Sequence, residues 1–364
     1  MFAIDAHLDL ATNAISLNRD LTRTSSEVRL LEKELNLTDW PDRGLGTVTL
    51  PDLRAGSIGL VIATIISRVA VRGNPVSMRS LIGWWSPAQA YAFGQSQLSW
   101  YRVMEEQGEM VQINSASALE KHLALWNDSS IPNDKKPIGY ILSLEGADSV
   151  INMDYLHRYY EDGLRAIGPA HYGPGRYAPG TRSDQSGLTE AGKTLLKEMD
   201  ALQMILDLTH LTDAGFFEAI DIYQGPVIAS HQNCRAIIPG ERQFSDEQIQ
   251  EIINRDGVLG GALDVWMLYP DYQYGQDPNE LGVKMEALVP HFDHICQMAG
   301  NSRHIAFGTD LDGLFGREQS PADLNTIADI QQFKELLSAR GYTQEDLENI
   351  FHNNWLRVFR KVLK

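Results

Sequence analysis

Eight short apolar runs recur along the chain, and most of them end in polar residues. They span residues 2–9, 58–67, 137–146, 163–171, 203–210, 225–231, 257–263 and 304–313. Several are nearly continuous in isoleucine, leucine, valine and alanine, which is the pattern of parallel strands buried on both faces. The pattern therefore predicts eight strands of one parallel sheet.

Amphipathic segments with helix start signals lie between these runs. Segment 86–107 opens with Ser86 as a helix N-cap, and Pro87 takes the first helical position. Ser245 and Gln248 form the sequence pattern of a capping box ahead of another helix. Three further helices are predicted to begin at Thr189, Thr212 and Thr343.

Strands that alternate with helices predict an α/β fold, a (β/α)8 barrel of the TIM type. We assign residues 1–364 to a single domain, because no linker divides the chain and such barrels often exceed the usual domain size. Loop insertions are expected at residues 18–57, 69–85 and 172–187.

The charge balance and the two cysteines exclude several classes of function. The formal net charge is −17, spread along the chain, whereas nucleic acids and anionic membranes bind basic surfaces. Neither is expected as a partner. Cys234 and Cys296 have no CxxC partner, so we expect neither a disulfide framework nor a structural zinc site of the cysteine type.

No secretory signal, membrane-spanning apolar run or lipid-anchor signal is visible in the sequence. We therefore expect a cytoplasmic location, with a trimmed leader as the alternative.

Polar residues stand at the carboxyl ends of most predicted strands, where barrels of this type carry their active sites. His7 and Asp9 alternate with Ala6 and Leu8 in the first run and are expected to point the same way. The other strand-end residues are Glu145, His171, His210, His231 and Asp310. Buried imidazoles and carboxylates are unfavourable unless they are paired or bind a cation, and this combination suits catalytic Zn²⁺ or a similar divalent ion.

Three histidines and two acids are enough ligands for two ions. Two ions about 3.5–4 Å apart can hold a hydroxide between them and polarise a carbonyl group. The sequence therefore predicts a hydrolytic metal centre at one rim of the barrel.

Five motifs occur in order at the strand ends. They are Asp5-Ala6-His7-Leu8-Asp9, Glu145-Gly146, "LDLTH" ending at His210, "ASHQNCRAI" with His231, and "GTDLDG" with Asp310. As an ordered set they resemble the motifs of the membrane (renal) dipeptidases, peptidase family M19 of the amidohydrolase superfamily. The first motif of that family has the form D-G-H-N-D, so this chain has Ala6 in place of the glycine and Leu8 in place of the asparagine.

The resemblance implies two Zn²⁺ ions as cofactors. His7 and Asp9 would hold one ion, His210 and His231 would hold the other, and Glu145 would bridge both. Other divalent ions remain an alternative to zinc.

The resemblance also implies roles in catalysis and substrate binding. Asp310 would take a proton from the bridging water and pass it to the leaving amine. His171 would contact the scissile carbonyl and stabilise the oxyanion. Arg242 would receive the terminal carboxylate of the substrate through two parallel hydrogen bonds. Asp312, the second acid of "GTDLDG", is expected to support its loop.

The function implied is a dinuclear zinc dipeptidase that hydrolyses short dipeptides, including those with a D-residue at the C-terminal position, through a metal-bridging hydroxide. Two alternatives stay open: a metal hydrolase of N-acyl amino acids, lactams or lactones, and a non-catalytic barrel that binds a metabolite or metal. A homodimer is expected by resemblance. Four arginines in loops near the expected pocket, Arg68, Arg72, Arg176 and Arg182, favour an acidic substrate side chain.

Overall fold

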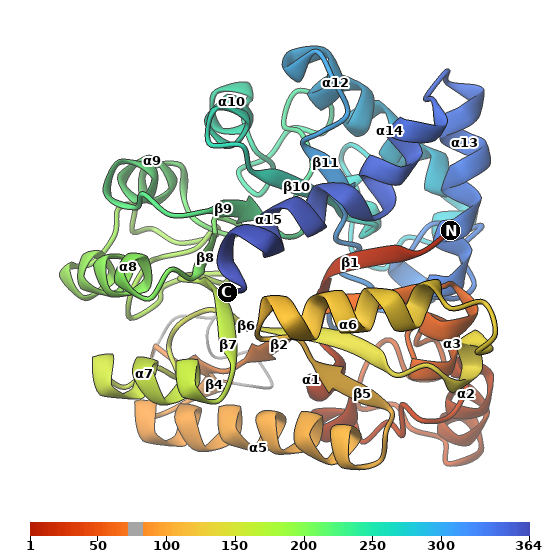
Figure 1. Ribbon diagram of the computed structural model, residues 1–364, viewed down its shortest axis with the longest axis horizontal. Helices are drawn as coiled ribbons and strands as arrows, with labels where there is room; N and C mark the ends of the chain where they lie inside the picture. The colour runs from red at the N-terminus through yellow and green to blue at the C-terminus, as the bar shows by residue number, and fades with distance from the viewer. Residues whose placement is uncertain (72–82) are drawn as a thin grey trace.

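Eight parallel strands pair edge to edge until the last meets the first, so the sheet of the computed structural model closes into a barrel (Figure 1). The structure describes residues 1–71 and 83–364. The barrel strands are β1 (Ala3–Leu8), β2 (Ile58–Ile66), β6 (Ile138–Glu145), β7 (Leu164–Gly168), β8 (Ile205–Asp207), β9 (Val227–Ala229), β10 (Val258–Gly261) and β11 (Ile305–Phe307). β2 pairs with β6, and β11 closes the ring on β1 with Phe307 opposite Asp5. Each predicted run contains one of these strands, and the predicted (β/α)8 barrel is confirmed.

Helices cover the sides of the barrel and one of its ends (Figure 1). They are α1 (Leu10–Ser16), α2 (Ser25–Glu34), α3 (Leu50–Ala55), α5 (Pro87–Glu106), α6 (Ala116–Asn127), α7 (Met153–Glu161), α8 (Glu190–Ala201), α9 (Asp213–Ile222), α10 (Asp246–Asn254), α11 (Pro278–Leu281), α12 (Val289–Ala299), α13 (Phe333–Ala339), α14 (Gln344–Glu348) and α15 (Asn354–Val362). The caps behave as predicted: the Ser86 hydroxyl accepts from the backbone of Gln89, and both halves of the Ser245–Gln248 capping box form. None of the helices among the described residues is long and apolar enough to cross a membrane.

Several elements were not predicted from the sequence, because they are short or lie in insertions. β5 (Met110–Gln112) pairs with the first part of β6, and β3 (Arg68–Val69) pairs with β4 (Gly83–Trp84) in a separate small sheet. Both small strands fall at the borders of the predicted loop 69–85, whose residues 72–82 lie outside the described part. The helix predicted from Thr343 is interrupted by a π-helical segment, Asn349–Asn353, between α14 and α15.

The predicted insertion at 18–57 carries α2 and α3; buried ion pairs hold it together, and hydrogen bonds to Asp312 tie it to the barrel. Arg19 contacts Glu32 at 2.9 Å and Asp42 at 2.8 Å. Asp312 accepts hydrogen bonds from the backbone N–H groups of Thr47 (2.7 Å) and Val48 (2.9 Å). Asp312 therefore supports the loop after β11, as the sequence suggested.

An inner cluster of apolar residues fills the barrel. It takes side chains from all eight strands and from α15: Ile4, Ala6, Leu60, Ile62, Ile141, Ala166, Ile205, Ile228, Val258, Ala306, Trp355, Leu356, Val358, Phe359 and Val362, among others. On β1, β6, β7, β8, β9 and β11 these residues precede the polar strand-end residues. α15, which Figure 1 shows across one end of the barrel, therefore closes the end opposite those polar residues.

An irregularity in β1 sets the direction of His7. The register between β1 and β2 shifts between Asp5 and Leu8. Ala6 belongs to the inner cluster, whereas Leu8 packs in the outer core between strands and helices. Ala6 and Leu8 therefore do not share a face, because a bulge adds a residue and re-aims the side chains that follow. His7 and Asp9 nevertheless come together as expected, with Nε2 of His7 4.0 Å from Oδ1 of Asp9.

Candidate metal centre and substrate cavity

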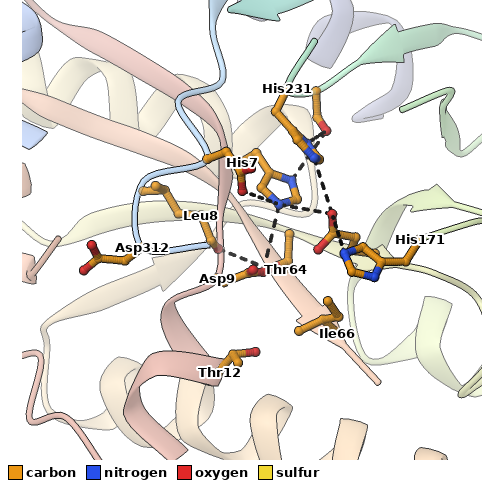
Figure 2. Close-up of polar contacts among 12 residues, drawn as sticks. His7, Leu8, Asp9, Thr12, Thr64, Ile66, His171, His231 and Asp312 are labelled. Carbon is orange, nitrogen blue, oxygen red and sulfur yellow. Dashed lines mark hydrogen bonds and ion pairs between the residues drawn. The ribbon is translucent and has the colours of Figure 1, made fainter. Parts of the chain in front are cut away.

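The strand-end histidines and acids converge at one rim of the barrel (Figure 2). The carboxylate of Glu145, at the end of β6, is their common neighbour. Its Oε1 atom lies 3.0 Å from Nε2 of His210, 3.4 Å from Nε2 of His231 and 3.5 Å from Nε2 of His7. Side chains separated by more than two hundred positions thus meet around one oxygen atom.

Asp9 and Asp310 flank His7. Oδ1 of Asp9 lies 4.0 Å from Nε2 of His7, and the hydroxyl of Thr64 donates to the same Asp9 oxygen. Oδ1 of Asp310 lies 3.7 Å from Nε2 of His7. In Figure 2, Asp312 lies apart from the imidazoles, in agreement with its contacts to the insertion.

The backbone is strained at this rim. His210 has a φ of 69° and Asp310 a φ of 59°, in the left-handed region that residues other than glycine rarely adopt. Leu314, farther along the same loop as Asp310, has a φ of 66°. Such conformations cluster at functional sites, where the surrounding structure holds them.

Burial and the mutual charges shift the pKa values of the site. Burial lowers the pKa of His210 to about 3, and the Arg242 guanidinium acts in the same direction. Burial alone also lowers the pKa of His7, but the carboxylates around it, Glu145 first, outweigh burial and raise that pKa to about 10. A neutral imidazole is the form that binds metal, and the grouped carboxylates favour positive charge beside them.

The side chains fit divalent cations. Nε2 of His7 is buried without a hydrogen-bond partner among the described residues, and Nε2 atoms of His210 and His231 face each other at 3.0 Å. The ligand atoms of three groups lie within 4.8 Å of one another: His7, Asp9 and Glu145; Glu145, His171 and His210; and His7, His231 and Asp310. Imidazole nitrogens and carboxylate oxygens in this arrangement are the donor set of a catalytic zinc site.

Two aspartates that the sequence analysis did not assign hold the metal-site strands in register. Oδ1 of Asp5 accepts from the backbone N–H of His7 and of Thr309, which follows β11. Oδ1 of Asp207 accepts from the N–H of Thr209 and of Ser230 on the neighbouring strand. The spacing is the only sequence signal: each aspartate precedes a metal-site histidine by two or three positions.

The hydroxyl of Ser230 lies close to the Nδ1 atoms of two candidate ligands, His231 and His7. Its oxygen lies 2.9 Å from Nδ1 of His231 and 3.5 Å from Nδ1 of His7. A partner on the second ring nitrogen orients a ligating imidazole and leaves Nε2 for a metal.

A cavity of about 500 Å³ opens above these residues. Asp9, Glu145, His171, His210 and Asp310 line it on the side of the metal centre. The rest of its lining includes Ile66, Tyr172, Asp264, Trp266, Tyr272, Tyr274, Leu314, Phe315, Glu318 and Gln319. This volume is in the range of small-molecule sites, about 300–1,000 Å³.

Of the two residues predicted to bind substrate, one lines the cavity and the other does not. His171 lines the cavity, with Nε2 4.0 Å from Oε1 of Glu145. Arg242 is buried behind His231 and does not line the cavity: its Nη2 donates to the carbonyl of His231 and its Nη1 to Gln232. Nε of Arg242 has no partner among the described residues.

Three of the four loop arginines are occupied by other contacts. Arg68 donates to the carbonyl of Tyr172, and Arg176 donates to three backbone carbonyls of the 148–151 segment. Arg182 stacks on aromatic rings at the rim. Arg72 lies outside the described residues. Arg68, Arg176 and Arg182 do not line the cavity.

Comparison with known proteins places the whole chain, residues 1–364, in the family described as membrane dipeptidase (peptidase family M19). An uncharacterized protein from the pqqA 5' region of Klebsiella pneumoniae is 29% identical, over 63% of this chain and 84% of its own length. Dipeptidase tcpJ of Claviceps purpurea is 26% identical, over 62% of this chain and 52% of its own length.

Among solved structures, a metallo peptidase from Rhodobacter sphaeroides, liganded with a phosphinate mimic of the dipeptide L-Ala-D-Ala, superposes with a TM-score of 0.77. It is 21% identical, and the match covers 100% of this chain and 99% of that one. At this level of identity the likeness establishes the barrel fold.

Proposed function

Because the chain belongs to the membrane dipeptidase family, peptidase family M19, and is thus a metallo-dipeptidase of that family, we propose a specific reaction for it. The reaction is hydrolysis of the peptide bond of short dipeptides with free ends, at a centre of two zinc ions. Dipeptides with a D-residue at the C-terminal position are included, since the Rhodobacter relative was solved with a mimic of L-Ala-D-Ala.

The observation that carries this proposal is that one carboxylate oxygen of Glu145 is shared by the candidate ligands. Oε1 of Glu145 approaches His7 at 3.5 Å, and the ligand atoms of His7, Asp9 and Glu145 lie within 4.8 Å of one another. The same Oε1 atom also approaches His210 at 3.0 Å and His231 at 3.4 Å. A shared carboxylate between two ligand pairs supports a two-ion centre, with His7 and Asp9 on one ion, His210 and His231 on the other, and Glu145 on both.

When bound, such ions supply acidified water and a polarised carbonyl group. The proton transfers need a group of the chain itself. Asp310 lines the cavity beside His7, and we assign it to accept a proton and deliver it to the leaving amine.

His171 and Arg242 complete the proposed substrate contacts. His171 faces the cavity beside Glu145, where its imidazole can donate to the carbonyl oxygen as negative charge develops there. Arg242 contributes a guanidinium whose Nε has no hydrogen-bond partner among the described residues, and we assign it to the terminal carboxylate of the substrate. Because it lies behind His231, this role requires it to approach the cavity when substrate binds.

The test is a dipeptide library assayed with zinc-replete protein and with chelated protein, alongside the matching N-acetyl amino acids. We expect hydrolysis of dipeptides that disappears on chelation and returns with zinc. The variant Glu145→Gln removes the shared carboxylate and should lose activity at least a thousandfold, whereas Glu190→Gln, on the exposed start of α8, should not change it. Faster hydrolysis of N-acetyl amino acids than of any dipeptide would contradict the proposal.

The homodimer and the cytoplasmic location remain proposals. Light scattering on the purified protein tests the first, with a mass of two chains as the expected result.

A further inference from the structure

We propose that the wall of the cavity formed by Asp264, Trp266, Tyr272, Tyr274 and Glu318, the acidic-aromatic wall, binds a cationic group of the substrate, an ammonium or a guanidinium. This inference rests on the proposed dipeptidase function and names the chemistry of the preferred substrate. All five residues line the same cavity as the metal-site residues.

The two carboxylates of the wall are held by neutral donors only. Asp264 is 5% exposed, and both of its oxygens accept from Nε2 of Gln319, at 2.9 and 3.0 Å. Both oxygens of Glu318 accept from the backbone N–H of Gly316. Within residues 1–71 and 83–364, neither carboxylate forms a salt bridge.

The charges of Arg242 and Arg182 act on Asp264 without forming an ion pair with it. A cation brought by the substrate would give a buried carboxylate a direct partner. The lining among the described residues includes no lysine or arginine that would compete for it. The same absence disfavours an acidic substrate side chain, for which the loop arginines had suggested a role.

The rings of the wall already hold one cation. The guanidinium of Arg182 lies 5.1 Å from the ring centroid of Trp266 and 5.8 Å from that of Tyr274, and its Nη2 donates to the Tyr274 hydroxyl. It also lies 4.7 Å from the ring of Tyr172. Arg182 does not line the cavity, so its contacts show that rings bordering the cavity accept a guanidinium.

Aromatic faces next to carboxylates are a recognised environment for organic cations, because the ring quadrupole and the full charges attract the same group. A dipeptide offers such a group in two places, the side chain of lysine or arginine and the free α-amino terminus. The acidic-aromatic wall would bind either of these positively charged groups, and the experiment distinguishes the side chain from the α-amino group.

The substrates are dipeptides of alanine with lysine, norleucine or glutamate in either position, and the same peptides acetylated at the amino terminus. Norleucine matches the lysine chain without its charge. The enzymes are the zinc-replete wild type, Asp264→Asn, Glu318→Gln and, as control, Asp271→Asn. Asp271 is exposed on the loop that carries Tyr272 and does not line the cavity.

Both test substitutions keep a side-chain acceptor of the same shape, so the cap on the backbone of Trp266 and the contact to Gly316 are retained. Zinc content and melting temperature report whether each variant is folded.

Recognition of a side chain predicts that wild type prefers lysine over norleucine by about tenfold or more in kcat/KM, and that Asp264→Asn and Glu318→Gln reduce this ratio to about threefold or less. Recognition of the α-amino group predicts that both variants slow all free dipeptides equally and that acetylation removes the difference between variants and wild type. Asp271→Asn should match wild type in either case.

Equal rates for lysine and norleucine, together with variants that leave every substrate within twofold of wild type, would overturn the inference. Calorimetric binding of the lysine and norleucine peptides separates this failure from a failure of the proposed function. Tighter binding of the lysine peptides without turnover would support cation binding by the acidic-aromatic wall and reject the dipeptidase reaction. Turnover without any preference for a charged side chain or amino terminus would support the dipeptidase reaction and reject cation binding by the wall.

Discussion

Three imidazoles approach one oxygen of Glu145 within 3.0–3.5 Å, and the side chains behind them decide whether that arrangement is rigid. Asp5 and Asp207 act alike in the two halves of the site. Each accepts from the N–H two residues further on and from an N–H at the end of the adjacent strand. Two of the site histidines, His7 and His210, are therefore positioned by backbone hydrogen bonds that the sequence shows only as an aspartate two or three residues ahead.

Replacing Asp207 by alanine should weaken both stability and metal binding. The N–H groups of Thr209 and Ser230 would be left buried without an acceptor, at about 1–3 kcal/mol each. We expect a loss of about 2–6 kcal/mol in the free energy of unfolding, measured in urea, and at least tenfold weaker zinc binding. Asp221→Ala, on the exposed side of α9, is the matched control, and an equal effect of both changes would contradict the assigned role.

Asp264 should make stability depend on pH in a defined direction. Burial raises its pKa to about 7, and the hydrogen bonds from Gln319 and Trp266 and the charge of Arg242 only partly oppose this. The folded protein thus keeps a proton that the unfolded chain releases near pH 4, so the unfolding free energy falls as pH rises from about 4 to about 7.

Asp264→Asn removes this dependence. The free energy of unfolding of Asp264→Asn minus that of wild type should therefore increase from about pH 4 to about pH 7. The increase is about 1.4 kcal/mol for each unit by which the Asp264 pKa is raised in the folded protein. Urea unfolding of both proteins at pH 4, 5.5 and 8 measures it. A difference that stays constant with pH would show that the Asp264 pKa is not raised.

At the scale of elements, the eight strands could be predicted because each lies in an apolar run, and most of these runs end at a polar residue. The helix starts at Ser86 and Ser245 could be predicted because their caps are local side-chain contacts. β5 could not, since three residues carry no usable periodicity and its position depends on pairing with β6.

The site was predictable to a similar degree. The strand-end histidines and acids converge because parallel strands bring their carboxyl ends to one rim. The bulge in β1 and the placement of Arg242 behind His231 depend on tertiary packing, which no motif records. The acidic-aromatic wall comes from three separate loop positions, and only the fold brings Asp264 and Glu318 together.

α15 should contribute stability without contributing to catalysis. Trp355 is fully buried, packs in the inner cluster and donates from its ring nitrogen to the carbonyl of Phe307. Trp355→Ala should destabilise the protein by about 3–5 kcal/mol and leave kcat/KM per folded molecule unchanged, because α15 lies at the end away from the metal centre.

Arg360→Ala, at an exposed position of the same helix, should change stability by less than about 1 kcal/mol. Thermal unfolding and activity at a temperature where both variants are folded measure the two effects. Loss of activity in folded Trp355→Ala would indicate coupling between the two ends of the barrel.

For the whole molecule, the candidate metal centre should also act as a structural element, since β1, β6, β8 and β9, from both halves of the barrel, each contain or lead into one or two of its residues. A ligand that binds only the folded state raises its stability. Chelation should therefore lower the melting temperature by several degrees, and zinc should restore it. The variant Glu145→Gln should show a smaller shift, because one ligand of both proposed ions is lost.

The most direct test of the two-ion centre is an anomalous difference map from zinc-loaded crystals, recorded on both sides of the zinc absorption edge. We expect two peaks next to the Glu145 carboxylate, one beside His7 and Asp9 and the other beside His210 and His231. A single peak, or peaks elsewhere with none near Glu145, would contradict the two-ion centre on which the proposed reaction depends.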